Sequence, residues 1–381
     1  MTVPVAPLKK TGRHSGPGTA GRPEGRSWAV SPAVDLGAAR ELAARAVRDS
    51  VLPCLVFGVV DSTGRQELFA ASGPRSAARE DSIFFVASVT KAIVATAVMQ
   101  YVDEGRMDLH APLARYLPGF AGSGRESVTA WHVLTHTSGL PDMDIEAMRR
   151  ERPSYARLLG HVMAGRPALP PGSRYEYNSS AWLLLSETMA RLSSMPFPMA
   201  LARRLTGPLQ MRDTSFDPRY ARRRVVAMNG FGVRNRLTGE ILLRFLARAT
   251  LPGGGMFGTV ADLLRLGCAL LDGGAGDGAV PGSTRILTRR AIEQMCRAQT
   301  EDIPHVAEDG TRTTVHQAIG WRKPAGDWPR RPAAITHGGI SGSRLWVDPE
   351  AGLAFALLTN LWDAPDEPVV AILEEVYRAR G

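Results

Sequence analysis

Apolar and polar positions follow clear periods near the start of the chain. In residues 34–50 the apolar positions recur at helical spacing, so the sequence predicts a helix there. An apolar run at 55–60, a turn and a second run at 67–70 predict a β-hairpin. The apolar stretch 88–104 predicts a second helix, and Gly105 is a suitable residue to end it.

The strand signal returns only near the end of the chain. Short apolar runs at 335–337, 345–347 and 353–358 predict strands, and residues 369–378 predict a closing helix. Between about 105 and 250, Pro and Gly interrupt the pattern, so loops and short helices are expected. We therefore predict an α/β (α+β) fold, in which one antiparallel sheet is built from both termini and flanked by helices, with a mostly helical insertion.

The predicted domain organisation follows the same division. Residues 1–30 are rich in Gly, Pro, Arg and Lys and predict a disordered tail. Residues 31–381 are expected to form one domain, since the chain is long enough to bury a large core. Its α/β part is predicted to span about 31–105 and 250–381, and its helical part about 106–249.

Composition and charge narrow the classes of function. The net charge is +9, but the arginines are scattered, so nucleic-acid binding is not expected. No apolar stretch is long enough to span a membrane, and the first 30 residues lack the apolar core of a secretory signal, so we expect a cytoplasmic protein. Cys54, Cys268 and Cys296 form no CxxC pair and are expected to be reduced thiols without zinc.

Lysine is rare in this chain, and one lysine stands inside an apolar run. Of the 46 basic residues, only those at positions 9, 10, 91 and 323 are Lys. Arg keeps its proton in a protein, whereas a buried Lys can lose it. A position at which a cation must also act as a base therefore requires Lys, and Lys91 fits this description.

Ser88 lies three residues before Lys91. On a helix the two side chains share one face, with Cβ atoms about 5–6 Å apart. Ser88 would stand in the first helical turn, where free N–H groups and the helix dipole favour negative charge, as suits a nucleophile whose attack creates an oxyanion. A capping Ser and an outward-pointing Lys are the alternative interpretation of the same pair.

Two later segments carry groups that a Ser–Lys pair needs. Tyr177 stands in a polar run between a Pro-Gly turn and an apolar helix, where its phenol can move protons near Lys91 or simply pack beneath the loop. His337 is followed by Gly338 and Gly339 at a strand end, and glycines of this kind let a substrate approach the backbone closely.

These residues, in this order, resemble the three motifs of the serine β-lactamase-like and penicillin-binding proteins. The motifs are Ser88-Val89-Thr90-Lys91, Tyr177-Asn178-Ser179 and His337-Gly338-Gly339. The resemblance is closest to the branch that contains class C β-lactamases, family VIII esterases and D-alanyl-D-alanine peptidases. Connecting segments are similar as well, and the likeness covers about residues 35–380: these segments are 104–109, 131–140, 208–216, 253–259 and 345–360. It implies a β-lactamase/transpeptidase-like catalytic domain that uses no metal and no other cofactor.

The resemblance also implies roles for the motif residues. Ser88 would be the acylated nucleophile, and Lys91 would accept its proton. Tyr177 would relay protons between Ser88, the leaving group and the incoming nucleophile. The backbone N–H groups of Ser88 and Ile340 would form the oxyanion hole.

The second and third motifs depart from the pattern of the relatives. His337 stands where many relatives carry Lys, and with Gly338 and Gly339 it would help to hold the proton network and a polar or anionic substrate group. Ser179 stands where relatives usually carry Asn, and its hydroxyl has a shorter reach. This difference makes a peptide-like or β-lactam substrate less expected, unless a local shift brings Asn178 into that position.

Three other patterns are weaker. The glycine pattern Gly253-x-Gly255-x-x-Gly258 matches a dinucleotide fingerprint, but no predicted strand precedes it. His132 and His136 are four residues apart but lack the Glu of a zinc-protease motif, and Ser138 has no base at helical spacing. No Gly-x-Ser-x-Gly elbow occurs in the sequence.

We therefore expect a cytoplasmic serine acyl-transfer enzyme that forms an acyl-Ser88 intermediate with an ester or amide. Its partners would be a small-molecule acyl donor and either water or an amine or alcohol acceptor, as in an esterase, an amidase or a transacylase of natural-product biosynthesis. The alternatives are a β-lactamase or D-alanyl-D-alanine carboxypeptidase, and a non-catalytic binding protein with the same fold.

Overall fold

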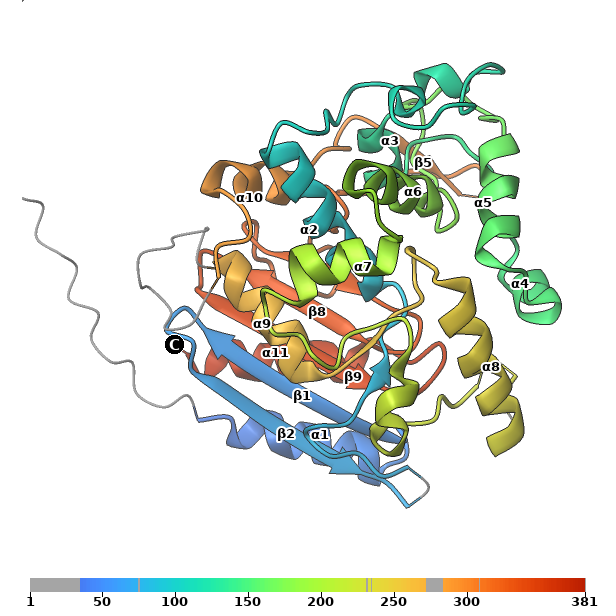
Figure 1. The fold of residues 1–381 in the computed structure, drawn as a ribbon. Helices are drawn as coiled ribbons and strands as arrows, with labels where there is room; N and C mark the ends of the chain where they lie inside the picture. The colour runs from blue at the N-terminus through green and yellow to red at the C-terminus, as the bar shows by residue number, and fades with distance from the viewer. Residues whose placement is uncertain are drawn as a thin grey trace, which may run out of the picture. The chain divides into compact units, whose positions relative to one another are not determined.

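An antiparallel sheet joins the first and last parts of the described chain. The structure is a computed structural model, and it describes residues 35–380 except 75, 231, 234, 272–283 and 308. Within these residues the strand order of the main sheet is β2-β1-β9-β8-β7. Figure 1 shows the blue strands from the start of the chain beside the red strands from its end. The bounds are β1 Cys54–Asp61, β2 Gln66–Ser72, β7 Ile335–Gly338, β8 Arg344–Asp348 and β9 Leu353–Thr359.

The register of the sheet confirms the predicted α/β class with a sheet built from both termini. β1 pairs with β2 on one side, and on the other side it pairs with β9, with Phe57 opposite Leu357. All pairs in this sheet are antiparallel. The predicted tail, residues 1–30, lies outside the described residues, and the division into domains stays a prediction.

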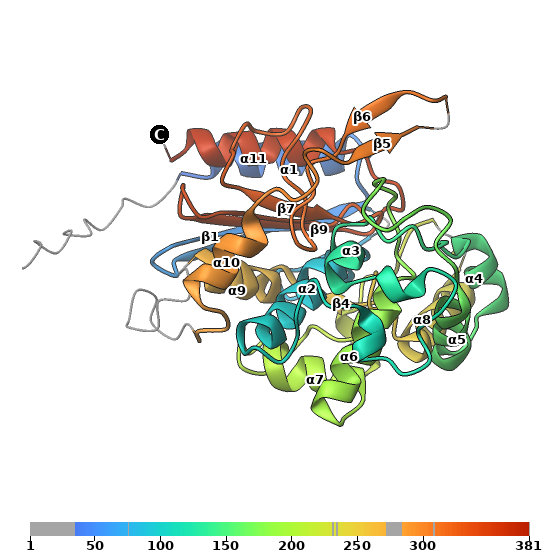
Figure 2. The ribbon, with the colours of Figure 1, turned by 90° about the horizontal axis from the view of Figure 1, so that it is seen from above.

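Helices cover both faces of the sheet, as Figure 2 shows from above. α1 (Gly37–Arg48) and α11 (Glu367–Arg378) pack against each other on one face. α9 (Val260–Leu271) crosses β1, β8 and β9 on the other face, next to α2 (Val89–Asp103). A Cβ on Gly267 would lie 2.5 Å from the Cβ of Ala354, so the close approach of α9 to β9 requires glycine. β9 is buried along its whole length because both of its faces are covered.

The region between α2 and α9 is mostly helical, as the sequence predicted. Two short antiparallel pairs, β3 with β4 and β5 with β6, lie outside the main sheet. Among the described residues, no helix has the length and apolar character that crossing a bilayer requires. The remaining elements are β3 Phe84–Phe85, α3 Ala130–Leu134, α4 Ile145–Glu151, α5 Tyr155–Ala164, α6 Trp182–Ser193, α7 Phe197–Leu201, α8 Arg236–Ala249, β4 Phe257–Gly258, α10 Arg289–Cys296, β5 Pro304–Val306 and β6 Arg312–Thr314. Short 3-10 or π-helical segments lie at Leu113–Arg115, Arg125–Ser127, Ala202–Thr206 and Pro218–Arg224, and the last of these is kinked at Ala221.

α2 is the central helix of the fold. Every residue from Val89 to Tyr101 is buried, and the helix is apolar on all sides. A helix of this composition cannot lie at the surface and must be enclosed by other elements. β7 and α10 pack against it. The first turn of α2, which carries Ser88 and Lys91, is therefore held inside the molecule.

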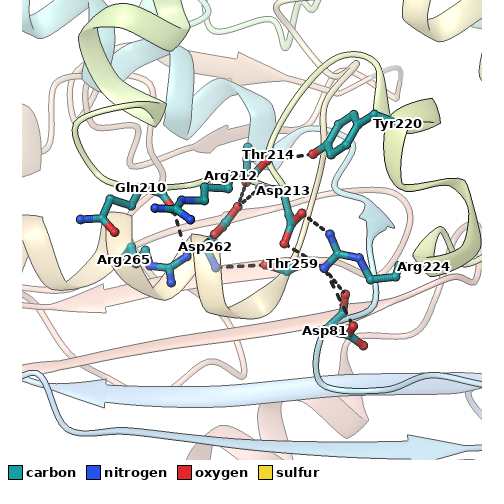
Figure 3. A network of polar contacts seen from close by, with 10 residues as sticks. All are labelled: Asp81, Gln210, Arg212, Asp213, Thr214, Tyr220, Arg224, Thr259, Asp262 and Arg265. Atoms are coloured by element: carbon teal, nitrogen blue, oxygen red, sulfur yellow. Dashed lines mark hydrogen bonds and ion pairs between the residues drawn. The ribbon is translucent and has the colours of Figure 1, made fainter.

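A polar network fastens the segment after α7 to α9 (Figure 3). Asp262 of α9 is 1% exposed and accepts hydrogen bonds from the Asp213 N–H at 2.8 Å and the Thr214 hydroxyl at 3.0 Å. Arg265 pairs with the same carboxylate at 2.5 Å, and Arg224 holds Asp213 with two hydrogen bonds. Burial raises the pKa of Asp262, against the hydrogen bonds that lower it. The carboxylate thus ties together two segments that are far apart in the sequence.

We expect Asp262→Ala to lower the free energy of unfolding by about 2–3 kcal/mol, because the N–H of Asp213 and the hydroxyl of Thr214 lose their acceptor. Urea unfolding followed by circular dichroism measures this change. The control is Asp81→Ala in the same network, since Asp81 is 54% exposed and its carboxylate comes only within 3.9 Å of Arg224. That exposed pair should contribute less than about 1 kcal/mol. Equal effects of the two substitutions would contradict a stabilising role for Asp262.

Candidate active site

Ser88 stands at the start of α2, directly after a strained residue. Ala87 has a φ of +44°, which is unusual for a residue other than glycine, and strain of this kind concentrates at functional sites. Ser88 itself is the N-cap residue, and its hydroxyl makes no capping hydrogen bond. Ser88 therefore occupies the position of a helix cap, but its hydroxyl does not cap the helix and is available for other partners.

Lys91 is completely buried, so the alternative of an outward-pointing lysine is wrong. Its Nζ lies 3.0 Å from the Ser179 Oγ and 3.4 Å from the Ser88 Oγ. It also donates a hydrogen bond to the carbonyl oxygen of Gly253. The structure thus brings the first and second motifs together at one amine, as the sequence predicted.

Tyr177 lies next to this amine. The Lys91 Nζ is 4.7 Å from the centre of the Tyr177 ring, and the ring is 37% exposed, so the phenol faces both the lysine and solvent. Desolvation raises the pKa of Tyr177, but the charge of Lys91, hydrogen bonding to Lys91 and Ser88, and the charge of Arg322 together outweigh it and lower this pKa. A phenol with a lowered pKa gives up its proton more readily and is better suited to act as a base near neutral pH.

Two buried histidines, His136 and His337, lie close enough to Lys91 to be affected by its charge. The ring of His136 lies 4.4 Å from the Tyr177 ring, and its Nδ1 accepts a hydrogen bond from the Asn178 N–H. Burial, followed by the charges of Lys91 and Arg322, lowers the pKa values of His136 and His337 well below the ordinary value. Both rings are therefore neutral at physiological pH. For His337, a neutral ring favours hydrogen bonding over attraction of a substrate anion by charge.

The two glycines after His337 are closely packed by the protein itself, and their expected role in letting a substrate approach the backbone stays a prediction. A Cβ on Gly338 would lie 2.6 Å from the guanidinium carbon of Arg344, which fills that space. A Cβ on Gly339 would lie 2.3 Å from the Ser343 Oγ and 2.6 Å from the Val86 carbonyl oxygen. Contact with the Val86 backbone therefore requires glycine at 339, where the end of β7 packs against the turn that carries Ser88, whereas a side chain at 338 would have to displace the end of Arg344.

Ser179, and not Asn178, faces the lysine. The Asn178 side chain donates to the Leu140 carbonyl at 2.7 Å and accepts from the Ala181 N–H at 2.8 Å. It is committed to the loop before α6, so a local shift does not bring it into the site. The position that relatives fill with Asn is occupied here by the Ser179 hydroxyl.

Ser88 opens onto a cavity whose wall also includes Ile340. The cavity has about 710 Å³ of empty space including its opening, and Ser179 and Gly253 lie on the same wall. Among the hydrogen bonds of the described residues, none uses the backbone N–H of Ser88 or of Ile340. The N–H groups of these two wall residues are thus available to a substrate oxygen, and their role as an oxyanion hole stays a prediction.

The sequence matches the model of the β-lactamase family over residues 39–377. The chain belongs to the β-lactamase family. As a member of this family it is an enzyme of the serine hydrolase type. The match covers α2, the Tyr177 loop and β7, so all three predicted motifs lie within it.

Individual relatives of this β-lactamase-family chain include both penicillin-binding proteins and esterases. Penicillin-binding protein 4 of Amycolatopsis lactamdurans is 32% identical over 296 residues, which cover 76% of this chain and 74% of the relative. Esterase EstB of Burkholderia gladioli is 29% identical over 344 residues, which cover 79% of this chain and 83% of the esterase. A family VIII carboxylesterase has a TM-score of 0.75 at 22% identity, covering 91% and 98% of the two chains. A variant of simvastatin synthase (LovD) from Aspergillus terreus has a TM-score of 0.71 at 18% identity, covering 91% and 96%. These two structures show the shared β-lactamase/transpeptidase-like fold.

Arg322 is a residue at the site of this β-lactamase-family enzyme that the sequence did not reveal. Its guanidinium carbon is 5.2 Å from the centre of the Tyr177 ring, and it donates to the Tyr175 hydroxyl at 3.3 Å. Its backbone exchanges two hydrogen bonds of 2.8 Å with Thr336 of β7, which fixes it beside the third motif. The chain contains many arginines, and the sequence gives no sign that sets Arg322 apart from the others. Its backbone pairing with β7 identifies it as a residue of the site.

We expect Arg322→Gln to move the acid limb of the pH profile of kcat/KM to higher pH. A base acts in its deprotonated form, so activity rises as the pH rises through the pKa of Tyr177, and removing the Arg322 charge raises that pKa. At pH 7 the loss should be about two- to fivefold, because Arg322 is exposed and its charge is screened.

The profile is measured by p-nitrophenyl ester hydrolysis at low and high salt. Arg289→Gln on α10 removes the same charge at an 83% exposed position and should leave the acid limb in place. Tyr177→Phe should lower turnover without a comparable loss of stability. If the acid limb stays unchanged in Arg322→Gln, the charge of Arg322 does not act on the general base.

Proposed function

We propose that this enzyme transfers acyl groups from small-molecule esters through an acyl-Ser88 intermediate. The observation that carries the proposal is the fully buried Lys91 amine within reach of the Ser88 hydroxyl, next to a phenol with a lowered pKa. A non-catalytic binding protein would have no need for a buried amine at this position, because burying it costs free energy. The cytoplasmic location expected from the sequence stays a prediction.

The contacts of Lys91 support its use as a base. A neutral amine has two N–H groups and one lone pair. The Gly253 carbonyl can only accept, so it takes one N–H, and the Ser179 hydroxyl can take the other. The third contact of the Lys91 Nζ is with the Ser88 Oγ at 3.4 Å, so an amine that has passed its proton to another base is in place to take the proton of the Ser88 hydroxyl. Arginine cannot reproduce this arrangement, because it has donors only.

In the first half-reaction, the Ser88 Oγ attacks the carbonyl carbon of the ester and forms a C–O bond. Its proton passes to the Lys91 amine and the Tyr177 phenol, which act together as the base. The N–H groups of Ser88 and Ile340 stabilise the oxyanion. The bond to the leaving group then breaks, and Tyr177 returns the proton to the leaving oxygen. In the second half-reaction, water, an alcohol or an amine gives its proton to the same pair and releases Ser88.

Esters are favoured over amides and β-lactams by the second motif. The Ser179 hydroxyl is already bonded to Lys91, so it has less capacity to hold a substrate amide than a longer Asn side chain. The relatives include both an esterase and a penicillin-binding protein. A β-lactamase or D-alanyl-D-alanine carboxypeptidase activity is therefore the second candidate.

We expect a stoichiometric mass adduct when the protein is mixed with a p-nitrophenyl ester, and no adduct in Ser88→Ala. Lys91→Arg should lower the acylation rate at least about 1,000-fold, because the base is lost while the charge remains. Intact-protein mass spectrometry and stopped-flow absorbance measure the two effects. Lys323→Arg is the matched control, since its Nζ donates to the Cys296 carbonyl and to none of the motif residues among those described, and it should acylate at the normal rate. An adduct that persists in Ser88→Ala would disprove the proposal.

The destination of the acyl group requires a separate experiment. The acyl-enzyme is formed with one ester and then divided among water, a series of alcohols and a series of amines. If the free acid is the only product at a saturating concentration of alcohol or amine, the enzyme is a hydrolase. If a new ester or amide forms, it is a transacylase. Acylation by a penicillin, compared with the ester in the same assay, tests the second candidate.

A further inference from the structure

We infer that the acyl group carried by Ser88 is an uncharged, apolar chain that lies between α4, α6 and α8, and that Phe245 limits its length. This inference rests on the proposed function and adds a substrate class to it. Figures 1 and 2 both show α4, α5 and α8 next to one another, on the side of the molecule away from α9 and α10.

The wall of the Ser88 cavity is apolar over most of its extent. α4 and the loop before it, α6, α8 and the loop after α8 all contribute to it. An acyl chain on Ser88 must enter this space, because Ser88, Ser179 and Ile340 line the same cavity. The large apolar side chains of the wall include Met143, Met148, Leu183, Phe245, Leu246 and Leu251.

The polar side chains of the wall already have partners within the protein. Arg149 pairs with Glu146 at 2.8 Å, the Ser180 hydroxyl bonds Asp142, and the Ser179 hydroxyl bonds Lys91. A carboxylate or ammonium group on the acyl chain would have to leave water without gaining a dedicated partner, which is costly. The cavity therefore selects against charged acyl groups.

Phe245 separates this cavity from a second one. The second cavity has about 510 Å³ of empty space including its opening, and it lies between the start of α5 and the outer side of α8. Arg152, Arg244 and Arg248 line it, together with Phe245. Since Phe245 belongs to both walls and is only 7% exposed, it stands between the acyl cavity and the second cavity.

The test measures kcat/KM for p-nitrophenyl esters from acetate to dodecanoate. With a constant leaving group, each methylene that becomes buried should raise kcat/KM about fourfold until the cavity is full. Beyond that length kcat/KM should fall. A p-nitrophenyl monoester of a dicarboxylic acid, matched in length to hexanoate, should react at least about tenfold more slowly than hexanoate.

Phe245→Ala should move the optimum to longer chains, because it joins the acyl cavity to the second cavity. Phe245→Leu should move it less, and this smaller change keeps the test valid if the alanine variant unfolds. Leu237→Ala is the control on the same helix, since Leu237 is 69% exposed and lines neither cavity. Circular dichroism and thermal melting verify that each variant is folded.

A chain-length profile that is flat or falls from acetate onwards would overturn the inference. So would a preference for the carboxylated ester, or an unchanged optimum in folded Phe245 variants. These outcomes leave the proposed function intact as long as acylation still depends on Ser88. Turnover that survives in Ser88→Ala instead removes the proposed function, and the inference with it.

Discussion

A single buried amine connects three segments that are distant in the sequence. The Lys91 Nζ contacts the start of α2, the loop before α6 and the loop after α8 through Ser88, Ser179 and Gly253. An amine removed from water requires partners, and these three oxygens supply them. The position of each segment is thus constrained by the same group that the chemistry uses.

The surrounding backbone is packed to keep these contacts. A Cβ on Gly253 would lie 2.4 Å from the Ser179 carbonyl oxygen, so the two loops touch through their backbones. Thr90, next to the lysine, accepts a hydrogen bond from the Met256 N–H at 3.1 Å. α9 begins a few residues after Met256 and packs on the sheet. The loop between α8 and α9 is therefore anchored by its contacts with α2 and by α9. The geometry at Lys91 therefore depends on the sheet as well as on the helical region.

The sequence predicted those parts of the fold in which apolar residues recur at a regular spacing. Strands β1, β8 and β9 were predicted to within two residues, because their apolar runs end at turn residues. α9 was not predicted, although it is clearly amphipathic, and neither was the acyl cavity with Phe245. The motif residues were found because order and spacing are visible in a sequence. The place of Arg322 at the site and the close packing at Gly338 depend on contacts between neighbouring strands. No local sequence pattern predicts such contacts.

The pairing of β1 with β9 has a consequence for how the protein is made. Leu55 pairs with Thr359, so the partner of the first strand is synthesised roughly 300 residues after it. Until then α2, which is apolar on all sides, has no complete enclosure. A nascent chain in this condition exposes a surface that favours aggregation and binding by chaperones. The ribosome therefore synthesises the chain through β7 and β9 before the sheet beside α2 is complete and the amine of Lys91 can be shielded from water.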